Sequence, residues 1–236
     1  EYLPGDSLRD IDWRASARSR QHQVRRFRTE SSADWFICLD RSASMSLHGN
    51  KKWALALRLT AALAYLLIHL DNRVGLILFS HRVDGMQPLG RGRQTYAAIL
   101  QLLQTMPPAV SGGGSALKAC GRHIRPGCQI IAVSDFLVPG GMRNDLSLLA
   151  AIAEQTQAIQ VLEAPAELQT GDGYITLQDI ESREQARILL SPAAREKLGE
   201  RMLQLVAELR AHCLRYRISF SSCNTSEHWR EVLLGH

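Results

Sequence analysis

Short apolar runs alternate along the chain with longer segments in which apolar residues recur every three or four positions. The short runs predict buried strands at 34–39, 74–79 and 129–134. The longer segments predict helices at 51–70, 93–105, 145–156 and 192–213, with one short helix after Ser115 and another at 227–234. Weaker patterns predict strands at 22–28, 83–89, 159–162, 174–177 and 216–220, with 83–89 as an antiparallel edge strand. Strands that alternate with helices predict an α/β fold with a mostly parallel central sheet and helices on both faces.

The composition fits a folded chain with one main core. With 236 residues, of which 45% are hydrophobic, the chain can bury one sizeable core, alone or with an appended segment. No stretch approaches the roughly 18 consecutive apolar residues of a membrane-spanning helix, so we expect no membrane insertion by this chain. The five cysteines form no CxxC pair and favour a reducing, cytoplasmic location. Because the sequence opens inside a motif and without Met, we also expect an upstream segment, and membrane association through it is the alternative.

Polar residues at alternate positions follow the first buried run. Asp40, Ser42 and Ser44 come just past the end of the strand at 34–39, where all three side chains can turn toward one point. Carboxylate and hydroxyl oxygens gathered in this way suit a hard divalent cation such as Mg²⁺. Open α/β sheets also bind their ligands beyond the carboxyl ends of strands. Capping of the strand end is the alternative interpretation, since Asp and Ser are common at such positions.

Two later segments complete a recognisable pattern. Ser111–Ser115 is a glycine-rich loop that ends in a hydroxyl, and the strand at 129–134 is followed by Asp135. This order of loops resembles the metal-ion-dependent adhesion site of von Willebrand factor A-like domains, which have a Rossmann-like fold. The resemblance implies that one Mg²⁺, or Mn²⁺ or Ca²⁺ in its place, is held by Asp40, Ser42, Ser44, Ser115 and Asp135. Ser115 stands where that family usually has Thr, and it keeps the hydroxyl oxygen.

The N-terminal residues indicate resemblance to a more specific family. Tyr2–Arg18 is similar to the signature Y-x-P-G-D-x-x-R-x-I-D-W-x-x-S/T-A-R of the bacterial domain-of-unknown-function family 58. This resemblance implies a signature segment at 1–33 that packs on a von Willebrand factor A-like domain at 34–236, which ends in a C-terminal helix and strand extension. It further implies a protein–protein interaction module without catalysis, in which the metal accepts a partner's acidic side chain. A MoxR-type AAA+ ATPase is the partner that the family suggests, with this chain as its adaptor.

Arginines crowd the same N-terminal region. Between residues 9 and 28 they outnumber the two acids, and Trp13 and Phe27 lie among them. The alternative function is therefore nucleic-acid or acidic-polymer binding, which the net charge of +5 permits. Internal ion pairs or an acidic partner surface explain the same residues, and we do not expect nucleic acid as the main partner. The candidate partner-binding residues are Arg14, Arg18, Arg25 and Arg26.

Motifs for enzymatic chemistry are incomplete. Gly112–Gly114 lacks the Lys-Ser/Thr that a phosphate-binding P-loop requires, and no HExxH pair or GxSxG elbow occurs. Asp40 superficially resembles the nucleophile of aspartyl-phosphate phosphatases, but Ser42 replaces their second acid. Lysine also looks scarce near the site, which leaves little to stabilise a phosphoryl group. We therefore predict that the chain is not an enzyme.

Overall fold

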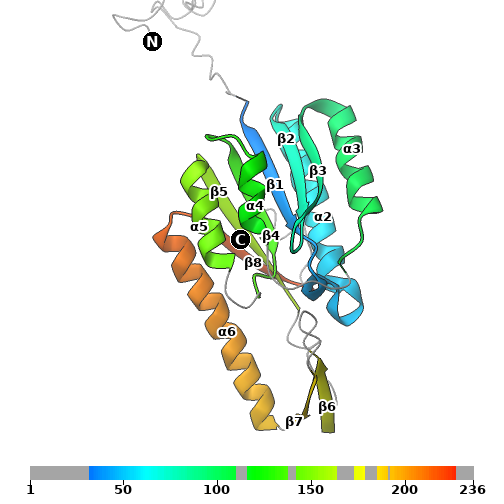
Figure 1. Cartoon of the computed structure of the whole chain (residues 1–236), viewed down its shortest axis with the longest axis vertical. Coiled ribbons are helices and arrows are strands. Elements are labelled where there is room, and N and C mark those ends of the chain that lie inside the picture. The colour runs from blue at the N-terminus through cyan, green and yellow to red at the C-terminus, as the bar shows by residue number, and fades with distance from the viewer. Residues whose placement is uncertain are drawn as a thin grey trace, which may run out of the picture. The chain divides into compact units, whose positions relative to one another are not determined.

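The computed structural model describes residues 32–109, 116–137, 142–163, 173–178, 185–190 and 192–226. Its centre is a six-stranded sheet with the order β3-β2-β1-β4-β5-β8 (Figure 1). Every neighbouring pair is parallel except β2 and β3, which are antiparallel. The strands are β1 Asp34–Asp40, β2 Arg73–Phe79, β3 Val83–Gly90, β4 Gln129–Ser134, β5 Gln155–Leu162 and β8 Ser219–Asn224. The prediction of a mostly parallel sheet with an antiparallel edge strand is confirmed.

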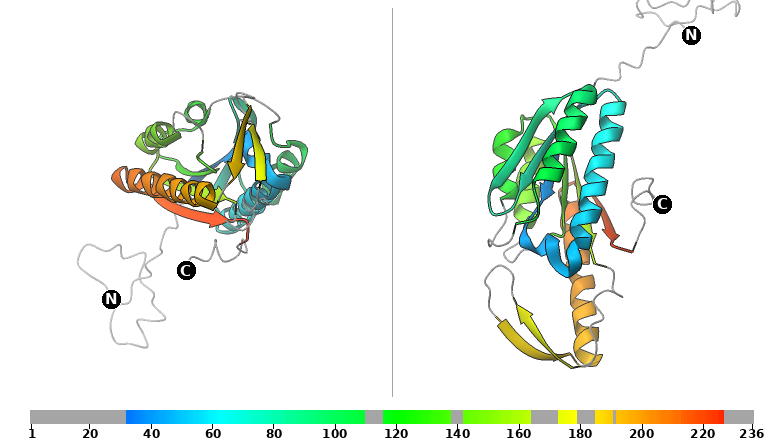
Figure 2. Two further views of the ribbon diagram at one scale, coloured as in Figure 1. Left: turned by 90° about the horizontal axis from the view of Figure 1, so that it is seen from below. Right: turned by 90° about the vertical axis from the view of Figure 1, so that its right-hand side faces the viewer.

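Helices cover both faces of this sheet, as the sequence predicted (Figure 2). One face carries α2 (Leu47–His69) and α3 (Gly92–Thr105). The other carries α4 (Leu117–Cys120), α5 (Met142–Ile152) and the C-terminal part of α6 (Pro192–Arg215). Two single 3₁₀ turns, η2 at Ala43–Ser46 and η3 at Gly121–His123, precede α2 and follow α4.

Side-chain alternation along the central strands separates the two hydrophobic cores. In β1, Ile37 and Leu39 point into the core under α2 and α3, whereas Phe36 and Cys38 point into the core under α4, α5 and α6. Successive side chains of a strand face opposite sides of the sheet, so a strand covered on both sides must be apolar at every position. This explains why the central strands read as continuous apolar runs.

Several boundaries and one element differ from the sequence prediction. Helix α5 ends at Ile152, and β5 begins at Gln155, earlier than expected, because the Glu154 N–H donates to the Cys128 carbonyl and draws the chain beside β4. Strand β8 begins at Ser219 because the preceding residues turn, with Arg217 at a positive φ of 55°. The strand predicted at 174–177 is present as β6 (Gly173–Gln178), but its antiparallel partner β7 (Gln185–Leu190) was not predicted.

Three predictions about secondary structure and packing fall outside the described residues. These are the strand at 22–28, the terminal helix at 227–234 and the packing of the segment 1–33 on the domain. They remain predictions.

Helix α2 is the most apolar helix of the described residues. By length and composition alone, Gly49–His69 could cross a membrane. However, Trp53, Leu55 and Leu59 are buried against the sheet and belong to the hydrophobic core of one face. The same composition is expected for the core helix of an α/β domain, which is the role this helix has here.

Gly75 in β2 provides a test of this packing. A Cβ at this position would lie 2.6 Å from Cε1 of Phe36 and 3.2 Å from the Gln87 carbonyl oxygen. Because overpacking forces side chains and backbone to shift, we expect Gly75→Ala to lower the free energy of unfolding by about 1–3 kcal/mol. The measurement is chemical denaturation of the whole chain.

Gly199→Ala is the matched control for this substitution. Gly199 lies within α6, and a Cβ there would meet no atom within 4 Å. Alanine favours a helix over glycine by up to about 1 kcal/mol, so this variant should be equally or more stable than the wild type. Equal stability of Gly75→Ala and the wild type would show that the close contact with Phe36 is not a constraint.

Candidate metal centre

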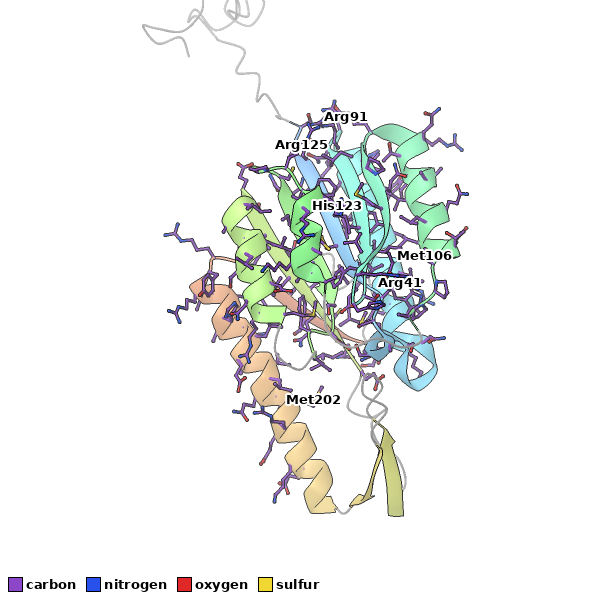
Figure 3. The ribbon with its side chains drawn as sticks, viewed as in Figure 1. Arg41, Arg91, Met106, His123, Arg125 and Met202 are labelled. Carbon is purple, nitrogen blue, oxygen red and sulfur yellow. The ribbon has the colours of Figure 1, made fainter. Side chains whose placement is uncertain are left out.

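Two buried carboxylates lie at the carboxyl ends of adjacent parallel strands. Asp40 is the last residue of β1, and Asp135 directly follows β4. The chain leaves β1 into α2 on one face of the sheet and leaves β4 into α5 on the opposite face. The ends of β1 and β4 therefore form a topological switch point, the place where open α/β sheets bind ligands. In Figure 3, the labelled Arg41 marks this end of β1.

The first predicted loop brings its three oxygen-bearing side chains together. The Ser42 backbone N–H donates to Asp40 Oδ1 over 2.8 Å, which folds the loop back onto the carboxylate. The Ser42 and Ser44 hydroxyl oxygens lie 3.0 Å apart. From the neighbouring strand, the Ser134 hydroxyl donates to Asp40 Oδ2 over 2.5 Å. Since each carboxylate oxygen has two lone pairs, both remain able to contact a cation.

Burial and a like charge raise the pKa of Asp40 to about 6. Burial is the larger cause, and the nearby Asp135 carboxylate is the second. The hydrogen bonds from Ser134 and Ser42 favour the charged form and offset part of this increase. Asp40 and Asp135 are thus close enough to repel one another, although they are separated by almost a hundred residues in the chain. A bound cation would relieve this repulsion.

Asp135 is held in place by several groups. Its Oδ2 accepts a hydrogen bond from the Lys52 ammonium over 2.8 Å, and its Oδ1 accepts one from the Leu137 N–H over 3.2 Å. Gln160 of β5 donates to the Asp135 backbone carbonyl over 3.0 Å. The next residue, Phe136, has a positive φ of 54°. This left-handed conformation is unfavourable for a bulky side chain, and the Phe136 N–H bond to the Ser134 hydroxyl helps to hold it.

Lys52 and Ser134 are site residues that the sequence prediction missed. The expectation that lysine is scarce here is wrong, because the Lys52 side chain is only 3% exposed and forms an ion pair with Asp135. A signal for Lys52 is present in the sequence: position 52 lies on the same helical stripe as the buried Leu55, Ala56 and Leu59. A lysine on the apolar face of a helix is expected to be buried, and a buried ammonium requires an acidic partner. No comparable feature of the sequence indicated that Ser134 is a site residue.

The second predicted loop is only partly described. Ser115 lies outside the described residues, but both ends of its segment are anchored beside the site. The Ala109 N–H donates to the Arg41 carbonyl over 2.6 Å, and the Ala116 N–H donates to the Ser80 carbonyl over 2.8 Å. Ser80 directly follows β2, the strand adjacent to β1. The predicted partner-binding residues Arg14, Arg18, Arg25 and Arg26 also lie outside the described residues.

An ion-pair cluster fastens the loops around the site. The Arg41 guanidinium lies 2.9 Å from Asp84 and also donates to the Pro107 carbonyl over 2.8 Å. Asp84 further accepts hydrogen bonds from the Ser80 hydroxyl at 2.6 Å and from Arg82 at 3.1 Å. Burial alone would raise the pKa of Asp84, but these hydrogen bonds outweigh burial and lower it. Arg41 therefore holds the loop after β1 against the start of β3 and the segment after α3.

The side chains at this site fit a hard cation. The described candidate ligands are one carboxylate and two hydroxyls of the first loop, with a second carboxylate from Asp135, and Mg²⁺ prefers such oxygen ligands. No group of three or more His, Cys, Asp and Glu residues that could hold a metal occurs among the described residues, so nothing there indicates a zinc site. Among the described residues, the Lys52 ammonium opposes a metal, because it already occupies Asp135 Oδ2.

Comparison with known proteins identifies the family. Residues 1–205 match the family described as protein of unknown function DUF58. The chain belongs to the DUF58 family. Uncharacterized proteins from Mycobacterium tuberculosis (strain H37Rv) and Mycobacterium bovis are 30% identical to it over 202 residues. The match covers 83% of this DUF58 chain and 63% of each relative.

A solved structure shares the fold of this DUF58 chain. The crystal structure of the conserved hypothetical protein BatB from Bacteroides thetaiotaomicron matches with a TM-score of 0.51. The alignment covers 86% of this chain and 98% of that chain, at 19% sequence identity. At this level of identity the likeness shows the fold alone. It therefore supports the α/β architecture and carries no information on ligands or partners.

The raised pKa of Asp40 predicts how stability changes with pH in the absence of metal. The unfolded chain has released this proton above about pH 4, whereas the folded chain keeps it up to about pH 6. Stability should therefore fall as pH rises through this window. We expect Asp40→Asn to be more stable than the wild type at pH 8, by roughly 1–3 kcal/mol, and this difference should shrink toward pH 4. The measurement is denaturant unfolding in chelator.

Asp71→Asn serves as the control. Asp71 is exposed and lies between α2 and β2, at the opposite edge of the sheet from the site. Its stability difference from the wild type should change little with pH. A destabilised Asp40→Asn at pH 8 would mean that the charged carboxylate is needed for folding and would contradict the repulsion described above.

Proposed function

We propose that this chain is a von Willebrand factor A-like protein–protein interaction module with a metal-ion-dependent adhesion site. Mg²⁺ is its proposed cofactor, held by Asp40, Ser42 and Ser44 together with Ser115 and Asp135. When bound, the metal would supply a positive charge that accepts a carboxylate from a partner protein. The proposal includes no catalytic step.

The observation that carries this proposal is the convergence of Asp40, Ser42 and Ser44 beside a second buried acid. The Ser42 N–H and Ser134 hydroxyl fix the orientation of the Asp40 carboxylate, and burial, followed by repulsion from Asp135, raises its pKa. Two carboxylates near one another, with the single ammonium of Lys52 described beside them, leave a negative charge that a divalent cation would neutralise. Strand-end capping explains the Ser42 bond but gives no reason to bury Asp40 against Asp135.

The chain's own residues prepare such a site for a partner. The ion pair of Arg41 with Asp84 and the backbone hydrogen bonds of Ala109 and Ala116 hold the described residues beside the site in a fixed arrangement. Groups held in place before binding lose less conformational entropy when the partner arrives. The partner class implied by the family resemblance is a MoxR-type AAA+ ATPase, for which this chain would serve as an adaptor. Since the chain spans 63% of its relatives' length, partners of the whole protein are part of the proposal.

Binding of nucleic acid or another acidic polymer through the N-terminal arginines remains the alternative prediction. It depends on residues outside the described part of the chain, and no described contact favours it. The two functions respond differently to conditions. Nucleic-acid binding should weaken steeply with salt and ignore a chelator, whereas the proposed adhesion should be lost in chelator.

Metal titration tests the proposed function. We expect Mg²⁺ and Mn²⁺ to bind the wild-type chain saturably in calorimetry and to raise its melting temperature. Asp40→Ala and Asp135→Ala should each abolish binding, because each removes a carboxylate ligand. Asp71→Asn removes a carboxylate at the far edge of the sheet and should bind as the wild type does.

Partner binding would be tested after the metal. Pull-down of a purified MoxR-type ATPase should require Mg²⁺ and be lost with Asp40→Ala. Folded wild-type protein that binds no divalent cation, alone or with this ATPase present, would contradict the proposed metal site. Retained capture by Asp40→Ala in chelator would instead place the interaction elsewhere on the chain.

A further inference from the structure

A buried lysine lies inside the proposed metal site. Lys52 is in the second turn of α2, the helix that begins just after the loop carrying Asp40, Ser42 and Ser44. Its side chain is 3% exposed, and Asp135 beside it is fully buried. The ammonium donates to Asp135 Oδ2 over 2.8 Å, and this carboxylate is its acidic partner among the described residues.

This position is unusual because Lys52 and a divalent metal need the same carboxylate. A buried ammonium paired with an acid is stable only while that partner is available. A divalent cation bound to Asp40 and Asp135 would repel the ammonium strongly at this short range and low dielectric. Lysine has a long flexible stem, so its charged end can move away while its Cα stays in place.

We propose that Lys52 is an internal cation that holds Asp135 when the site is without metal, and that Mg²⁺ binding displaces it. This inference rests on the proposed function, because it describes the regulation of the same site. In the metal-free state, the ion pair compensates the buried charge of Asp135 and keeps its side chain oriented. In the metal-bound state, Asp135 faces the metal and the Lys52 ammonium is released from it. Lys52 thus lowers the affinity for Mg²⁺.

Replacement of the ammonium by a neutral side chain of similar length tests this competition. Lys52→Met should bind Mg²⁺ at least about tenfold more tightly than the wild type in calorimetry, a factor typical of coupling between two sites. In chelator this variant should melt at a lower temperature, because Asp135 is left as an unpaired buried charge. Saturating Mg²⁺ should raise its melting temperature more than that of the wild type.

Lys51 is the matched control, since it is the adjacent lysine on the same helix but is exposed. Lys51→Met removes the same charge from the chain and leaves the ion pair of Lys52 with Asp135 in place. It should bind Mg²⁺ as the wild type does, which separates the specific ion pair from a general change in net charge.

Chemical labelling of the wild-type chain gives a second measurement that does not depend on a variant folding. Reductive methylation should modify Lys52 slowly in chelator because it is buried and paired. Saturating Mg²⁺ should increase the rate of Lys52 modification several-fold, as read by mass spectrometry, and leave Lys51 unchanged. If Lys52→Met fails to fold, this result decides the proposal.

The outcomes separate this inference from the proposed function. If the wild type binds Mg²⁺ and Asp40→Ala does not, while Lys52→Met has wild-type affinity, the metal site stands and the displacement of Lys52 is wrong. Unchanged labelling of Lys52 at saturating Mg²⁺ overturns it equally. If neither the wild type nor folded Lys52→Met binds Mg²⁺, the proposed metal site and the inference fail together.

Discussion

The burial of two carboxylates at the ends of adjacent strands is the constraint on which the rest of the site depends. The parallel register of β1 and β4 pairs Leu39 with Val133, so the residues that follow both strands emerge at the same edge of the sheet. Asp40 and Asp135 are brought together by this register although they lie far apart in the chain. A charge out of water is costly, so every nearby polar group must compensate it. The hydroxyl of Ser134, the N–H of Ser42 and the ammonium of Lys52 serve this purpose.

The two hydrophobic cores make this arrangement rigid. Each central strand is packed on both faces, and close-packed interiors allow little movement of the strand ends. At this end of the sheet, Arg41 links the loop after β1 to Asp84 of β3 and to the Pro107 carbonyl in the segment after α3. The polar groups at the site are therefore positioned by packing behind them and by ion pairs around them. A cation entering such a site would meet ligands that are already oriented.

The relation between Lys52 and the proposed metal gives the site two alternative sources of positive charge. One belongs to the chain and is always present, whereas the other depends on the concentration of a divalent ion. Because both would act on Asp135 in this proposal, the site would satisfy its buried charge without metal and still respond to the metal. The helix that carries Lys52 begins just after the loop that carries Asp40, so the ion pair lies beside the start of α2.

Elements that follow from a local pattern of residues could be predicted from the sequence alone. Continuous apolar runs predicted β1, β2 and β4, helical spacing predicted α2 and α3, and the spacing of Asp40, Ser42 and Ser44 predicted a polar loop after the first strand. The family signature at the N-terminus was likewise readable, and the match to DUF58 confirms it. The folded structure was needed to establish that Lys52 pairs with Asp135, that Ser134 holds Asp40, and where β5 and β8 begin. These features arise from contacts between residues far apart in the chain. The periodicity and spacing of residues along a sequence do not show which distant groups come into contact.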